Sequence, residues 1–168
     1  MTQEGDALRS IAPGAAVAAS VVRLRKRQGW TADDLAVECA GLGMPSLNRS
    51  VIANIESGRR KSVTVDELCC LAFALDVAPV HLLVPMDDEA EGPNAYEAAP
   101  EAMLSLQQAR RWIRGEWVPP GRDPRLYFAN VPAEEFAAIE SADERGKRRR
   151  DIIHQLEGKK PKRSGDGR

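Results

Sequence analysis

The most informative segment of this chain reads Asn48-Arg49-Ser50-Val51-Ile52-Ala53-Asn54-Ile55-Glu56-Ser57-Gly58. At about 100° per residue, Val51, Ile52 and Ile55 fall on one side of a helix and form an apolar surface. Asn48 is a favoured N-cap residue, and Gly58 provides a stop signal. The pattern therefore predicts a short amphipathic helix over residues 48–57. Small or hydrogen-bonding side chains occupy its other side: Arg49, Ser50, Ala53 and Asn54.

Two helices are predicted before this one. Residues 15–28 have a helical pattern that Gly29 ends. Thr31 is followed three positions later by Asp34, which is close to a capping box and marks the start of a second helix. The segment 40–47 then contains two glycines and a proline, so we expect a turn there.

Two further helices are predicted after it. Thr64 and Glu67 form a capping box at the start of a helical pattern over residues 65–75. Pro79 is well placed as the first residue of a short fifth helix. We therefore predict an all-α fold in which five helices occupy residues 15–85.

Composition and charge divide the whole chain of 168 residues into parts. Residues 1–85 carry nine basic and nine acidic side chains, residues 86–144 have a net charge of −8, and residues 145–168 have a net charge of +7. We expect a flexible N-terminal arm (1–14), the five-helix domain (15–85), an acidic linker broken by Gly and Pro (86–100), a helical C-terminal region of unknown role (101–157) and a disordered basic tail (158–168).

The predicted C-terminal region contains two tryptophans close together, Trp112 and Trp117. A helical pattern over residues 101–116 places Trp112 on its apolar side, and large aromatic side chains favour burial. The simplest interpretation is that they dock on the main domain. A dimer contact, a ligand pocket or a surface for a partner protein are the alternatives.

Several functional classes are disfavoured by the composition. The three cysteines, Cys39, Cys69 and Cys70, lack zinc-ligand spacing and are expected to be reduced thiols. No nucleophile elbow, phosphate loop or metal-ligand cluster is found, so we predict no enzyme activity, no catalytic residues, no metal and no cofactor. No apolar run reaches the length of about 18 residues that a membrane span needs, so we expect a cytoplasmic protein without a membrane partner.

A set of residues distributed over the five predicted helices resembles a known family. The residues are Arg25 four before Gly29; Thr31 followed by Leu35-Ala36; Ile52, Ile55-Glu56 and Gly58; and Leu71-Ala72 with Leu75 and Val77. Together they resemble the Cro/CI-like, or XRE-like, helix-turn-helix transcriptional regulators, in an actinobacterial form with an extended turn. The resemblance covers roughly Val17 to Leu83, about 40% of the chain.

The resemblance implies that the third helix enters the DNA major groove while the second crosses the backbone. Arg49, Ser50 and Asn54 then occupy the base-reading positions. Their chemistry suits this role, because arginine can donate two hydrogen bonds to guanine and asparagine can pair in both directions with adenine. Serine is less selective.

Four other residues are predicted to contact the DNA backbone. Thr31 lies at a helix N-terminus, and Arg59, Arg60 and Lys61 follow the third helix. Contacts of this kind fix the position of a protein on DNA without reading its sequence. For the three basic residues, a solvated loop is the alternative interpretation.

The resemblance also implies an ion pair between Arg25 and Glu56 that joins the first helix to the third. The chain departs from the family pattern at Ala32, where glutamine commonly contacts phosphate, and in the turn over residues 40–47. That turn is about six residues longer than the usual compact one. Both departures affect how the third helix would enter the groove.

We therefore expect a sequence-specific DNA-binding transcriptional regulator, more specifically a repressor, that binds double-stranded DNA as a homodimer on an inverted repeat. It would be cytoplasmic and associated with the nucleoid when bound. The alternative is a protein-interaction module, or a DNA-binding antitoxin whose C-terminal region binds a partner protein. The neutral charge of residues 1–85 favours this alternative, since dedicated DNA binders are usually basic.

Overall fold

A computed structural model describes residues 9–86, 95–132, 134–137 and 141. The predicted basic tail, most of the predicted flexible arm, residues 87–94 of the predicted acidic linker, and residues 133, 138–140 and 142–157 of the predicted helical C-terminal region lie outside these residues. The chain divides into two compact units, Met1–Trp117 and Val118–Arg168. Each unit is described by itself.

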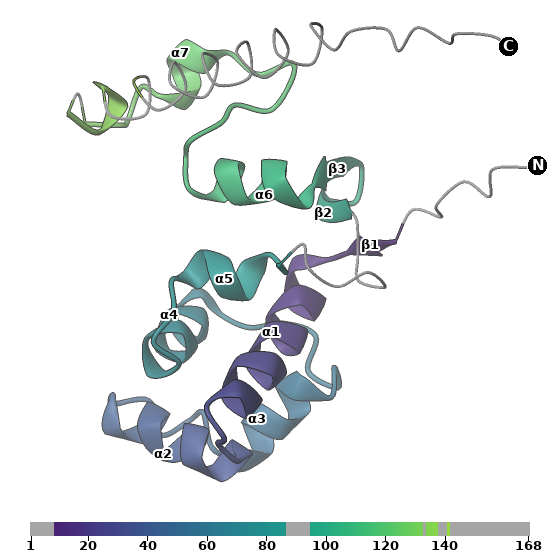
Figure 1. The fold of residues 1–168 in the computed structure, drawn as a ribbon, viewed down its shortest axis with the longest axis vertical. Helices are drawn as coiled ribbons and strands as arrows, with labels where there is room; N and C mark the ends of the chain where they lie inside the picture. The colour runs from purple at the N-terminus through teal and green to yellow at the C-terminus, as the bar shows by residue number, and fades with distance from the viewer. Residues whose placement is uncertain (1–8, 87–94, 133, 138–140, 142–168) are drawn as a thin grey trace, which may run out of the picture. The chain divides into compact units, whose positions relative to one another are not determined.

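The first unit contains the five predicted helices (Figure 1), and each begins and ends within a few residues of its expected position. They are α1 (Pro13–Arg27), α2 (Ala32–Gly41), α3 (Arg49–Glu56), α4 (Val65–Ala74) and α5 (Pro79–Leu83). The prediction of a mainly helical protein is confirmed.

Side-chain caps explain why three of these helices begin where they do. Thr31 at α2 and Thr64 at α4 each accept a hydrogen bond from the backbone of the third helical residue, whose side chain in turn accepts from the cap backbone. Asn48 caps α3 by accepting from the Val51 amide at 3.1 Å. Gly58, with φ of 70°, follows the end of α3 in a left-handed conformation that favours glycine.

The main core lies between the five helices. α1 packs against α3 and α5, and α2 packs against α3 and α4 (Figure 1). The fully buried side chains in this core come from every helix and from the turn before α3: Val21, Leu35, Cys39, Leu47, Ile52, Leu71, Leu75 and Leu82. The apolar side of α3 predicted from the sequence is therefore the side that faces the core, through Ile52 and Ile55.

The structure corrects the expectation of an all-α chain, because the first unit also contains a three-stranded sheet. Its order is β1 (Ser10–Ile11), β2 (Ala95–Ala99) and β3 (Ala102–Ser105), with β1 parallel to β2 and β2 antiparallel to β3. The predicted arm therefore ends in a strand, and α1 begins at Pro13 rather than Ala15. The predicted linker 86–100 likewise contains strand β2.

The expectation of a purely helical region from residue 101 is also wrong. A strand comes first, and α6 (Leu106–Ile113) begins only after Ser105, which caps it by accepting from the Gln108 amide. Tyr96 and Leu106 are buried with Ala16 of α1 and Val84 in a second apolar cluster. This cluster attaches the sheet and α6 to the start of α1 and the end of α5.

The second unit is described over a short stretch. It contains α7 (Pro124–Tyr127), which Asp123 caps by accepting from the Arg125 amide, and residues 134–137 are helical. Phe128 packs edge-on against both Tyr127 and Phe136, with ring centroids 5.1 and 5.2 Å apart. Aromatic contacts therefore hold this small element together.

Gly14, the second residue of α1, generates a stability prediction. A Cβ atom at this position would lie 2.5 Å from the Lys61 carbonyl oxygen, whereas one at Gly41 of α2 would meet nothing within 4 Å. A Gly-to-Ala change in a helix normally stabilises a protein by about 0.4–1 kcal/mol. We expect Gly41→Ala to raise the free energy of unfolding in this way and Gly14→Ala to lower it, as measured by urea denaturation. A gain for Gly14→Ala would contradict the close approach.

Candidate nucleic-acid interface

The outward side of α3 carries the three predicted base-reading residues. Arg49 and Ser50 are exposed, and Asn54 is half-buried. All three line an open groove between α2 and α3. α2 contributes Asp33 and Val37 to the groove, and the valine side chain is 66% exposed. The two faces of α3 therefore divide as predicted, with apolar residues in the core and polar ones beside an accessible groove.

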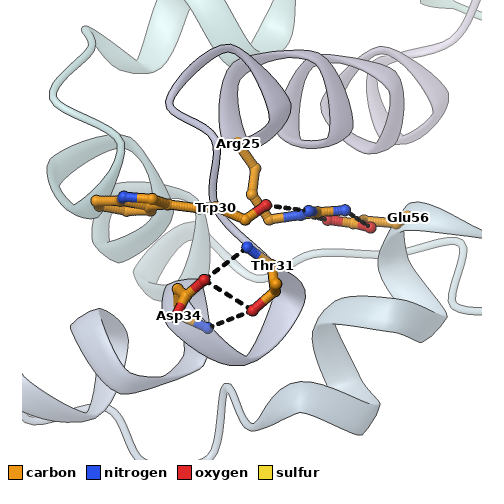
Figure 2. Close-up of polar contacts among 5 residues, drawn as sticks. All are labelled: Arg25, Trp30, Thr31, Asp34 and Glu56. Atoms are coloured by element: carbon orange, nitrogen blue, oxygen red, sulfur yellow. Dashed lines mark hydrogen bonds and ion pairs between the residues drawn. The ribbon is translucent and has the colours of Figure 1, made fainter.

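The orientation of α3 is fixed by a partly buried ion pair (Figure 2). Arg25 Nε donates to Glu56 Oε1 at 2.6 Å, and Nη2 donates to Glu56 Oε2 at 2.8 Å, so the pair is bidentate. The remaining amino group, Nη1, donates to the Trp30 carbonyl oxygen at 2.6 Å. This is the pairing that the family resemblance implies, and it joins the end of α1 to the end of α3.

Hydrogen bonding to Glu56 raises the pKa of the Arg25 guanidinium, although burial opposes the shift. The side chains of Arg25 and Glu56 are only 11% and 13% exposed. Charged groups this far from water depend on each other, because either one left alone would lack compensation. The pair therefore limits how α3 can move relative to α1.

Thr31, a predicted DNA-backbone contact, is engaged within the protein (Figure 2). Its hydroxyl donates to Asp34 Oδ2 at 2.8 Å and accepts from the Asp34 amide at 3.2 Å, while its own amide donates to the same carboxylate at 2.7 Å. These hydrogen bonds from Thr31 favour the charged carboxylate and lower the pKa of Asp34. The hydroxyl and the amide of Thr31 are thus both used to start α2.

The three basic residues after α3 are placed differently from one another. Arg59 is exposed and lines the groove. Arg60 turns away to Glu67 of α4, with 2.8 Å between Nη2 and Oε2, and its amide donates to the Asn54 carbonyl oxygen at 2.9 Å. Lys61 is exposed and does not line the groove. Only Arg59 of this trio therefore stands beside the predicted base-reading residues.

Two features of this region were missed by reasoning from the sequence. Glu67 was recognised as a capping residue, but the same carboxylate also holds Arg60. Burial tends to raise the Glu67 pKa, but its hydrogen bonds to Thr64 and Arg60 outweigh this and lower it overall. No role was predicted for Asp33, although it lines the groove. Asp33, Val37 and Ala40 are spaced i, i+4 and i+7, which places them on one face of α2. This spacing is a signal in the sequence that could have shown that Asp33 lies on the groove side of the helix.

The two tryptophans, for which docking on the main domain was the first interpretation and a partner surface an alternative, are both half-buried. Trp112 belongs to α6, and Trp117 follows that helix. The neighbouring Arg110 donates from Nη1 to the Pro85 carbonyl oxygen at 2.7 Å, which ties α6 to the end of the five-helix core.

Cys39 lies in the main core next to Cys70, which is partly buried against the same cluster. Burial raises the pKa of the Cys39 thiol to about 12, with a further contribution from Cys70. Since the thiolate is the form that binds metals and attacks other groups, Cys39 is chemically inert in this state. Among the described residues, no group of three His, Cys, Asp or Glu side chains is arranged to hold a metal ion.

Comparisons of the chain with protein-family models, with curated proteins and with solved structures found no match. Over the part of the chain that the structure describes, no helix is both long enough and apolar enough to cross a membrane.

The ion pair generates a second stability prediction. Glu56→Ala leaves the Arg25 guanidinium without its carboxylate, and we expect the free energy of unfolding to fall by about 3–5 kcal/mol. The double variant Arg25→Met/Glu56→Leu removes both charges and should recover much of that loss. Urea denaturation of the two variants checks this. If the double variant were as unstable as Glu56→Ala, the loss would come from packing rather than from an uncompensated charge.

The capping box of α2 generates a prediction about pH. The Asp34 pKa is lower in the folded protein than its ordinary value of 3.8, so its ionised form stabilises the fold above that pH. The stabilisation is lost as the pH falls through the lowered value. We expect Asp34→Asn to lower the melting temperature most near neutral pH, and the difference from the unmodified protein to shrink as the pH falls below 3.8 through the lowered pKa. A difference independent of pH would contradict this origin.

Proposed function

We propose that this chain is a sequence-specific DNA-binding transcriptional regulator of the XRE-like type, in which α2 and α3 form the helix-turn-helix. The observation that carries the proposal is the division of α3. Its inner side is held by Ile52, Ile55 and the Arg25–Glu56 ion pair, while its outer side presents Arg49, Ser50 and Asn54 beside an open groove. A rigid helix with free polar side chains on one side is what reading of base edges requires.

In this proposal, the three outward residues differ in what they recognise. Arg49 is exposed at the first position of α3, from where it can make two hydrogen bonds to guanine O6 and N7. Asn54 can pair with adenine N6 and N7. Its backbone carbonyl already accepts from Arg60, so the residue is anchored while its side chain faces the groove. Ser50 adds a less selective hydrogen bond.

In this proposal, fewer of the predicted residues are available to contact phosphate. Arg59 is the basic residue best placed for them, and Lys61 is exposed nearby along the chain. Arg60 is better assigned to holding the loop, because its side chain is only 32% exposed and is paired with Glu67. Thr31 keeps its role at the start of α2. Backbone contacts set affinity and position but carry no sequence information.

We further propose that the regulator is a repressor that binds an inverted repeat as a homodimer. One module of this size buries limited DNA surface, and two symmetric copies would place their α3 helices about one DNA turn apart. Such a protein would act in the cytoplasm, associated with the nucleoid when bound.

A second candidate is a protein-interaction module, which includes a DNA-binding antitoxin that also captures a partner protein. The observation that favours it is the apolar content of the same groove, where Val37 is largely exposed next to Ala36 and Ala40. Apolar surface on a helix pair can accept a helix of another protein. The half-buried Trp112 and Trp117 are the other place for such a partner.

The test of DNA reading uses Arg49→Ala. We expect this variant to lose about 1–3 kcal/mol of binding free energy on its preferred DNA site and to relax the preference at one base pair. Selection of sites from random DNA with the purified protein provides the site, and fluorescence anisotropy measures the affinity. The matched control is Arg27→Ala, which removes an exposed arginine on α1 that does not line the groove.

The outcomes separate the two candidates. If Arg49→Ala and Arg27→Ala had the same preferred sequence and the same affinity, Arg49 would not be a base-reading residue. A protein without measurable, salt-sensitive affinity for any DNA would belong to the protein-interaction class, because phosphate contacts make all DNA binding depend on salt.

A further inference from the structure

The groove between α2 and α3 holds a carboxylate as well as arginines. Asp33 lines it together with Arg49, Asn54 and Arg59. The residue is exposed, and its carboxylate makes no hydrogen bond or ion pair with any residue that the structure describes. A negative charge therefore stands at the surface that, in the proposed function, faces DNA.

The neighbouring carboxylate behaves differently. The Asp34 carboxylate accepts two hydrogen bonds from Thr31, and the Asp34 amide donates a third to the Thr31 hydroxyl, so this residue is used to cap α2. Asp33 belongs to the same first turn but is directed into the groove. In helix-turn-helix complexes this helix crosses the DNA backbone, so in the proposed function a charge at the start of α2 would lie near phosphate.

We propose that Asp33 limits the affinity of this protein for DNA by repelling phosphate at the start of α2. The proposal rests on the proposed function and extends it to a residue that has no base-reading role. With Thr31 engaged in the cap and Arg60 engaged with Glu67, few groups of this surface attract the backbone. Because the surface attracts phosphate only weakly, DNA binding then depends mainly on the base contacts of Arg49 and Asn54.

The size of the effect follows from electrostatics. Two like charges a few ångströms apart at a water-exposed surface repel each other by about 1 kcal/mol. Removing the Asp33 charge should therefore raise the affinity for DNA about three- to tenfold at low salt. Salt screens the interaction, so the gain should shrink as the ionic strength rises. The gain should be the same for every DNA sequence, because every sequence has the same phosphates.

The chain supplies a matched control at Asp66. Thr31-Ala32-Asp33-Asp34 opens α2 and Thr64-Val65-Asp66-Glu67 opens α4, each through a capping box, so the two aspartates occupy the same helical position. Asp66 is exposed but does not line the groove. Asp33→Asn and Asp66→Asn remove the same charge near the same kind of helix end, and both should change stability by a similar small amount.

The experiment measures binding of the full chain and both variants to a labelled random-sequence DNA duplex by fluorescence anisotropy, at about 50 and 200 mM salt. Asp33→Asn should bind about three- to tenfold more tightly than the unmodified protein at the lower salt, with a smaller gain at the higher salt. Asp66→Asn should stay close to the unmodified protein. Melting curves of both variants verify that the folds are equally intact.

Two negative results are distinguishable. If the unmodified protein binds DNA in a salt-dependent manner and Asp33→Asn binds no better than Asp66→Asn, the role of Asp33 is refuted and the proposed function stands. If no form of the protein binds DNA at either salt concentration, the proposed function fails and the role of Asp33 fails with it.

Discussion

The placement of α3 depends on one interaction, the bidentate ion pair between Arg25 and Glu56. A single guanidinium contacts the last residue of α3 and the Trp30 carbonyl between α1 and α2. Three segments of chain are thereby held by one planar group, whose donors match a carboxylate in geometry as well as in charge. Buried pairs of this kind contribute more to a defined arrangement than to net stability. Here the defined arrangement is the direction in which α3 presents its outer face.

Local signals in the sequence predicted most of the helical core. Caps at Thr31, Asn48 and Thr64 fixed where helices begin, and a 3.6-residue periodicity identified which sides of them are buried. The sheet could not be predicted in the same way. β1 is two residues long and pairs with a strand about 85 positions later, so neither strand has a local signal. Alanine-rich β2 also has a low β propensity, and tertiary packing around Tyr96 overrides it.

At the candidate interface, the positions of residues on α3 were predicted better than the positions of residues in the loop that follows it. Residues whose role follows from helix periodicity, such as Arg49 and Asn54, lie beside the groove. Residues in the loop after α3 have no such periodicity, and contacts with other elements decide their positions. Arg60 is held by Glu67 of α4, while Arg59 stands at the groove. Electrostatic partners are a property of the folded chain, and counting basic residues in a loop therefore overestimates how many are available to a ligand.

The sheet has a consequence for the order in which this unit can form during synthesis. All residues of the main core have been made once the chain reaches Leu83, whereas β2, β3 and α6 come later. Until Tyr96 and Leu106 emerge, Ala16 at the start of α1 has no cover from the second cluster. Because β1 must wait for β2, the first strand of the protein is also among the last elements to be completed. The five-helix core is thus assembled from segments that follow one another in the chain. The sheet, in contrast, needs β1 and β2, which lie far apart in the sequence.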